Sequence, residues 1–106
     1  MIEITFKPKT MMVKVTGHAG QAEKGQDIVC SAVSILFYTL AQAVTDSRDL
    51  LKDEPCIITN DGDGLVACTP KEGFVGIIQR TYWTILTGFE LLADEYKDYV
   101  KLTVIE

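Results

Sequence analysis

One cysteine and the only histidine of the chain form a pair that could do covalent chemistry. His18 and Cys30 lie at either end of a glycine-rich stretch. A cysteine thiolate can attack a carbonyl carbon, and an imidazole can take up and deliver the proton that such a reaction moves. If the fold brings the two side chains together, they are the minimal parts of a thiol nucleophile with its general acid and base.

A helix is predicted to position Cys30. Asp27 directly precedes a run in which apolar residues recur every three or four positions, namely Val29, Val33, Leu36, Phe37, Leu40 and Val44. Asp is a preferred N-cap residue, so we expect the helix to begin within about two residues of Asp27. With Asp27 as the N-cap, Cys30 is the third residue of the helix and lies in its first turn. The field and the unpaired N–H groups of a helix start favour a thiolate, and they could also form an oxyanion hole.

A loop is predicted to position His18. Segment 17–26 contains three glycines and no bulky apolar residue, so we expect a loop that is mobile in the free protein. It leads from the end of a strand to the start of the helix that carries Cys30, which allows the imidazole to approach the thiol. Spacing alone also fits a simpler structure, because a packed thiol at a helix start and a solvated loop histidine are both common.

The other candidate ligands and thiols carry weaker signals. Cys30, His18 and Asp27 lack the paired spacing that is typical of zinc ligands, so we expect no metal site. Cys56 and Cys68 fall within short apolar runs that are predicted to be strands. We expect both of these cysteines to be inert core residues.

Hydrophobic periodicity predicts seven elements in the order ββαββαβ. The patterns indicate an N-terminal hairpin (2–7 and 11–16), a second hairpin (56–59 and 65–68) and a last strand (100–105). Thr69 and Glu72 form a capping box with Pro70 after the cap, so a second helix is predicted from there to about Tyr96. We expect an α/β two-layer sandwich of the α+β class, with both helices packed on one face of a mixed, mostly antiparallel sheet.

Composition and charge further restrict the class of protein to which the chain can belong. The chain has 106 residues, 47% of them hydrophobic and 24% charged, so we expect one folded domain that spans 1–106. Its net charge of -5 disfavours direct binding of nucleic acid. Polar residues interrupt the longest apolar stretch (28–44), no signal peptide is recognisable, and an odd number of cysteines indicates reduced thiols. We therefore expect a cytoplasmic protein that is not in a membrane.

The segment around Cys30 resembles the signature of a known family. Its parts are the sequence GHA at 17–19, a loop that contains glycine, and the sequence DIVCSAVS at 27–34. In this combination they are similar to the ribosomal-processing cysteine proteases, small bacterial proteins known as Prp. The resemblance extends along the whole chain, with a similar length and the same order of elements. Ser31 is one departure, since Ala is expected there in many relatives.

The resemblance implies an activity and a role for each residue of the motif. Members of the family remove a short N-terminal extension from the precursor of ribosomal protein number twenty-seven of the large subunit. They are homodimers, and their substrates carry bulky apolar residues just before the scissile bond; no cofactor is expected. Cys30 matches the family nucleophile and His18 its catalytic partner, while Asp27 and Ser34 match supporting positions. The implied reaction is hydrolysis of a peptide bond by a Cys–His dyad.

Two other interpretations stay open on the sequence. In a non-enzymatic ribosome-associated binding module, the loop would contact the partner and Cys30 would be structural. In a redox-sensing protein, Cys30 would need a resolving cysteine, and neither Cys56 nor Cys68 is close in sequence. The role of Asp27 is open as well, because it can cap the helix or orient His18. Its negative charge near the thiol would oppose thiolate formation, which favours the cap.

Overall fold

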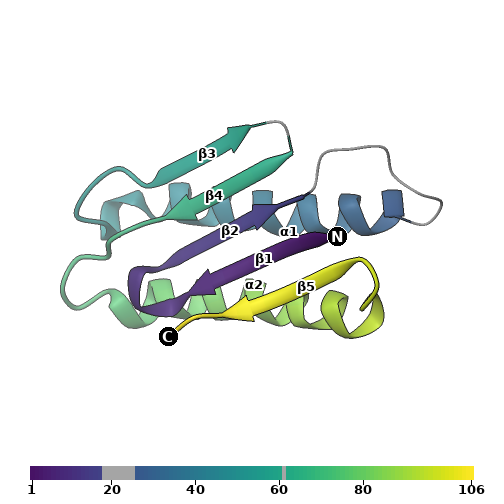
Figure 1. The fold of residues 1–106 in the computed structure, drawn as a ribbon. Helices are drawn as coiled ribbons and strands as arrows, with labels where there is room; N and C mark the ends of the chain where they lie inside the picture. The colour runs from purple at the N-terminus through teal and green to yellow at the C-terminus, as the bar shows by residue number, and fades with distance from the viewer. Residues whose placement is uncertain (18–25, 61) are drawn as a thin grey trace.

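The computed structural model describes residues 1–17, 26–60 and 62–106, with the backbone alone at residues 26 and 27 (Figure 1). Its main elements are β1 (Ile2–Lys7), β2 (Met12–Thr16), α1 (Gln26–Asp46), β3 (Cys56–Asn60), β4 (Asp63–Ala67), α2 (Val75–Glu95) and β5 (Val100–Val104). Short 3₁₀ turns, η1 (Pro8–Thr10) and η2 (Arg48–Leu50), follow β1 and α1. The predicted order ββαββαβ is confirmed.

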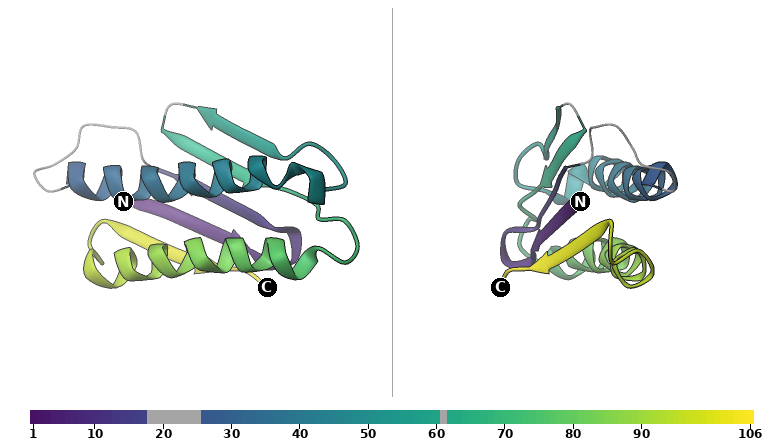
Figure 2. Two further views of the ribbon diagram at one scale, coloured as in Figure 1. Left: turned by 180° about the vertical axis from the view of Figure 1, so that it is seen from behind. Right: turned by 45° about the vertical axis from the view of Figure 1, so that its right-hand side comes forward.

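The five strands form one mixed sheet in the order β3-β4-β2-β1-β5. β1 and β5 are parallel, and the other three neighbouring pairs are antiparallel. Helices α1 and α2 lie side by side over the same face of this sheet (Figure 2). This is the predicted two-layer α+β sandwich.

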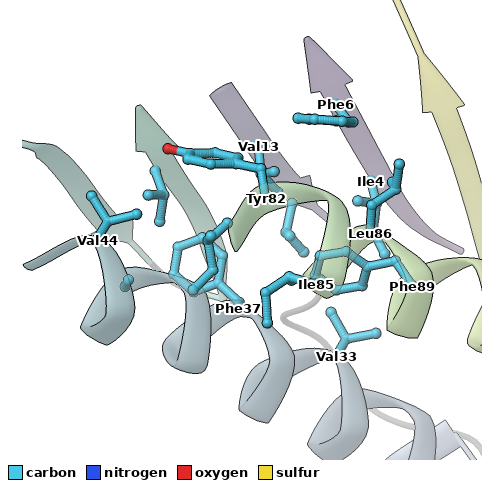
Figure 3. Packing of buried hydrophobic residues seen from close by; sticks show 14 of the residues in the cluster. Ile4, Phe6, Val13, Val33, Phe37, Val44, Tyr82, Ile85, Leu86 and Phe89 are labelled. Carbon is cyan, nitrogen blue, oxygen red and sulfur yellow. The ribbon is translucent and has the colours of Figure 1, made fainter. Parts of the chain in front are cut away.

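The core lies between the sheet and the two helices (Figure 3). Successive side chains of a strand point to opposite faces, so Ile2, Ile4 and Phe6 of β1 are buried while Glu3 is exposed. The buried side chains of the helices follow the helical period: Val33, Phe37, Leu40 and Val44 in α1, and Ile78, Tyr82, Ile85, Leu86 and Phe89 in α2. Burial of each large apolar side chain contributes about 1.5–3 kcal/mol, which fixes both helices on the sheet.

Helix α2 begins at Val75, so the prediction of a capping box at Thr69 is wrong. No side chain caps this helix, whose N-cap is Phe74. Residues 69–71 instead pair with the segment that follows α1. The N–H of Lys71 donates to the carbonyl of Leu50 at 2.8 Å, and the N–H of Lys52 donates to the carbonyl of Thr69 at 2.8 Å. These long-range hydrogen bonds hold residues 69–71 against that segment, and a turn with Gly73 at a left-handed φ of 90° then leads into α2.

The two cysteines outside the motif differ in burial. Cys68, directly after β4, is buried as predicted. Cys56 is exposed, so its prediction as a core residue is wrong. It belongs to β3, an edge strand in which all five residues are exposed. An edge strand away from the helices has little to bury its side chains, whatever their hydrophobicity.

Helix α1 is more apolar than the polar residues that interrupt it suggested. Among the described residues, one helix, Ile28–Asp46, is long and apolar enough to cross a membrane by length and composition. The core helix of a soluble protein passes the same test. In this fold the apolar face of the segment, including Val33 and Leu40, is buried against the sheet and α2.

Candidate active site

Helix α1 positions Cys30, two residues further from the helix start than expected. The helix begins at Gln26, which confirms a start within two residues of Asp27. Asp27 is therefore the second residue of the helix and not its N-cap, and Cys30 is the fifth and not the third. The first four N–H groups of a helix lack intrahelical partners, so the N–H of Cys30 is not one of them. The prediction that Cys30 lies in the first turn is wrong, because that turn ends one residue before Cys30.

Cys30 lies at the border between the buried and the exposed sides of α1. Its neighbour Val29 is fully buried, while Ile28 and Ser31 are exposed, and Cys30 itself is half-buried. The side chain lines an open groove of about 360 Å³ that runs along the helix, together with Ser31, Ser34, Ile35 and Tyr38. A reactant can therefore reach the Cys30 position from solvent.

A second hollow continues this groove toward the sheet. It has a volume of about 260 Å³ and lies between α1 and the β3–β4 hairpin. Ser34 and Tyr38 line both hollows, so the two form one continuous surface. The lining of the second hollow is partly apolar, with Val15 and Phe37, and partly polar, with Thr59, Asn60 and Asp63.

Sequence reasoning missed most of this surface. Tyr38 could have been found, because Cys30, Ser34 and Tyr38 follow one another at four-residue steps and so share one side of α1. The ring of Tyr38 packs edge-on against Phe37, with ring centroids 5.5 Å apart, and this contact supports it over the hollow. The hairpin residues carry no such local signal, since only the sheet topology brings them to α1.

Asp63 links the hairpin to the end of β2. The backbone N–H of Gly17 donates to Asp63 Oδ1 at 3.2 Å. Gly17 immediately precedes His18 in the chain. His18 itself, and the loop that was predicted to be mobile, fall in segment 18–25, outside the described residues. Of Asp27 only the backbone is described, whereas Ser34 lies half-buried one turn after Cys30.

The described residues provide no second reactive centre. Within residues 1–17, 26–60 and 62–106, no group of three or more His, Cys, Asp or Glu side chains is arranged to hold a metal ion. The O–H of Tyr82 donates to Cys68 Sγ at 3.5 Å. Burial raises the pKa of the Cys68 thiol, and the hydrogen bond from Tyr82 partly opposes this effect. Burial also raises the pKa of Tyr82, so both groups stay protonated at neutral pH.

These features are those that a small thiol-dependent hydrolase needs: a cysteine held on a core helix and half-buried at the edge of an open groove. Comparison with known proteins makes the class specific. The chain belongs to the family described as cysteine protease Prp, whose model matches residues 1–101. It is therefore a cysteine protease.

Solved structures have the same fold over nearly the whole chain. The crystal structure of SMU.848 from Streptococcus mutans is 25% identical with a TM-score of 0.71, and the match covers 98% of this chain and 91% of that one. The ribosomal processing protease Prp from S. aureus, with a covalently linked product peptide, is 22% identical with a TM-score of 0.75, covering 99% and 100%. The same enzyme with a substrate peptide is 23% identical with a TM-score of 0.74, covering 98% and 97%. No curated protein matches the chain at a significant level.

Proposed function

We propose that this chain is a ribosomal-processing endopeptidase that uses Cys30 and His18. Its substrate is the precursor of ribosomal protein number twenty-seven of the large subunit, from which it removes the N-terminal extension. The observation that carries the proposal is the position of Cys30 in a protein of the Prp family: half-buried and lining an open groove. The S. aureus enzyme of the same fold is described as a ribosomal processing protease, and its structures contain a substrate peptide or a covalently linked product peptide.

The proposed reaction is acyl transfer through a thioester. Cys30 Sγ attacks the carbonyl carbon of the scissile bond, and a C–S bond forms as the C–N bond breaks. His18 takes the thiol proton and delivers it to the leaving amine. Water then hydrolyses the thioester, which releases the new carboxylate and regenerates the thiol. We assign Ser34 a supporting role because it lies one turn after Cys30 and lines both hollows.

Two properties of the surface suit this substrate. Ile35 is 64% exposed and Tyr38 56% exposed, and both line the groove at Cys30. Exposed apolar side chains beside the proposed nucleophile would bind bulky apolar residues near the scissile bond. The net charge of -5 would also attract a ribosomal protein rich in Lys and Arg. We extend the proposal to a cytoplasmic homodimer of one protease domain (1–106), as the family resemblance implies.

The proposal is tested by incubating the protein with the purified precursor and measuring product masses. The wild type is expected to yield the shortened ribosomal protein and a released peptide. The Cys30→Ala and His18→Ala variants should yield neither, because His18 is the only histidine and no second dyad can form. Cys56→Ser is the matched control, since it changes an exposed thiol on β3 and should cleave at the wild-type rate.

Two outcomes would contradict the proposal. If the Cys30→Ala variant trims the precursor at the wild-type rate, the thiol is not the nucleophile. If the wild type binds the precursor and leaves it intact, the non-enzymatic binding module becomes the better description. Circular dichroism of each variant checks that the fold is kept, which is expected because Cys30 lies outside the buried core cluster and is only packed against it.

A further inference from the structure

We propose that Asp63 is a positioning residue for the reaction: its carboxylate fixes Gly17, the residue that immediately precedes His18 in the chain. The inference rests on the proposed function, because it assigns His18 a part in catalysis. Asp63 lines the hollow that continues the Cys30 groove, and its Oδ1 accepts the hydrogen bond from the N–H of Gly17.

Gly17 is held from two sides. Besides the hydrogen bond to Asp63, its backbone has a left-handed φ of 78° and passes close to the carbonyl oxygen of Met1. A Cβ at this position would overlap that oxygen, so only glycine fits the approach. The last residue before His18 is therefore fixed between the start of β1 and the start of β4.

The carboxylate of Asp63 continues the β2–β4 ladder beyond its last pair. The register of these strands ends at Val15 with Gly64, and Asp63 is the next residue outward. Figure 1 shows the start of β4 beside the end of β2. A further backbone pair at this point would join Asp63 to Thr16, whereas the side chain of Asp63 reaches one residue further along the chain, to Gly17. This contact joins residues 46 positions apart.

The same hairpin is fixed to the helix that carries Cys30. Gly64 lies against the ring of Phe37, and a Cβ on Gly64 would stand 2.6 Å from Phe37 Cζ. Phe37 is buried and belongs to α1, two turns after Cys30. A continuous set of contacts therefore runs from α1 through Phe37 and Gly64 to Asp63 and then to Gly17. Through it, Gly17 is placed relative to the helix that carries Cys30.

This placement matters because catalysis is sensitive to small changes in geometry. Consecutive Cα atoms are about 3.8 Å apart, so a fixed Gly17 limits the region that the imidazole of His18 can occupy. A misplacement of about 1 Å can cost about a hundredfold in rate. Loss of the Asp63 carboxylate should therefore lower the rate of the chemical step and leave substrate binding largely unchanged.

The test compares Asp63→Ala with Asp63→Asn, which keeps an oxygen acceptor for the Gly17 N–H. We expect Asp63→Ala to lower kcat by about 10–100-fold with little change in KM, and Asp63→Asn to restore most of the rate. Asp53→Ala is the matched control, because it removes an exposed aspartate outside both hollows. Thermal melting of each variant shows whether a rate change follows from lost stability.

A second measurement needs no substrate. In a Cys56→Ser background, the rate of Cys30 alkylation by iodoacetamide is followed against pH for the wild type, His18→Ala, Asp63→Ala and Asp63→Asn. We expect the Asp63→Ala profile to move toward that of His18→Ala, and the Asp63→Asn profile to stay at the wild type.

The outcomes separate the inference from the proposed function. If His18→Ala shifts the alkylation profile and Asp63→Ala does not, the role of Asp63 is wrong and the dyad stands. If His18→Ala shifts nothing, the dyad itself is wrong, and the inference falls with it. If Asp63→Asn loses as much activity as Asp63→Ala, the hydrogen bond to Gly17 is not what positions the segment.

Discussion

Cys30 and Cys68 carry the same functional group, but the fold places them in opposite environments. Cys30 lies on the side of α1, half-buried at the edge of an open groove. Cys68 lies after β4, buried among core side chains and hydrogen-bonded by the O–H of Tyr82. Burial raises the pKa of the Cys68 thiol and so keeps it neutral and unreactive. The comparison shows that position relative to the core decides which cysteine can be a nucleophile.

Cys56 shows that exposure to solvent alone does not make a cysteine a candidate nucleophile. It is exposed on an edge strand, but the hollow between α1 and the hairpin is lined by other hairpin residues, such as Thr59 and Asn60. Cys30 combines access with an open groove, as the proposed nucleophile requires. The region of Cys68 is part of the core, whereas the region of Cys30 is less buried.

The largest expected effect is a difference in thiol accessibility. In the native protein, Cys68 should react with a neutral alkylating reagent at least about a hundredfold more slowly than Cys56, because labelling requires the core to open first. Mass spectrometry of peptides after timed labelling measures each rate. Cys30 should be labelled as well, and selectively at mildly acidic pH if it is an activated thiolate.

Labelling in denaturant provides the control. Once the chain is unfolded, Cys56 and Cys68 should react at similar rates, because the difference arises from the fold. Rapid native labelling of Cys68 would contradict the comparison. Failure of Cys30 to react under native conditions would remove the basis for assigning it as the nucleophile.

Much of the fold follows from local patterns. The period-two alternation of Ile2, Ile4 and Phe6 and the stripe from Val29 to Val44 correctly predict which faces are buried, because burial repeats with the geometry of the element. The start of α1 is less well determined, since the apolar stripe begins only at Val29 and two polar residues, Gln26 and Asp27, precede it in the helix. Cys30 is therefore two residues further along the helix than predicted, and its N–H is not one of the unpaired N–H groups at the helix start.

The remaining errors come from contacts between distant segments. The capping box at Thr69 has the correct local chemistry, but its backbone is held by hydrogen bonds to the segment after α1. Cys56 lies in an apolar run, and only the strand order reveals that the run is at the edge of the sheet. Asp63 was missed for the same reason, because its partner Gly17 is brought near by the β2–β4 pairing.

The hydrogen bond between Tyr82 and Cys68 should have a moderate effect on stability. Tyr82→Phe removes the hydroxyl and keeps the ring, which stacks on Phe6 with centroids 6.0 Å apart. We expect the free energy of unfolding to fall by about 0.5–1.5 kcal/mol, the usual net contribution of one hydrogen bond. Urea denaturation followed by circular dichroism measures the change. If Tyr82→Phe is instead more stable than the wild type, the Tyr82 hydroxyl forms no favourable hydrogen bond in the core. The environments of Cys68 and Cys30 would then differ less than the comparison states.

The smallest expected effect is a dependence of stability on alkaline pH that is specific to Cys68. Its ordinary pKa is 9.0, and burial raises this value in the folded protein. Below the unfolded pKa the thiol is protonated in both states, so its contribution to stability is fully present. As pH rises above it, the unfolded chain loses the proton first, which favours unfolding until the pH passes the folded pKa. The midpoint of urea denaturation should therefore decrease between about pH 8 and pH 10.

Cys68→Ser keeps an acceptor for the Tyr82 O–H and does not titrate in this range, so its decrease should be shallower than that of the wild type. Equal slopes for the two proteins would show that Cys68 ionises as readily in the fold as in the unfolded chain, and that burial does not set it apart from Cys30.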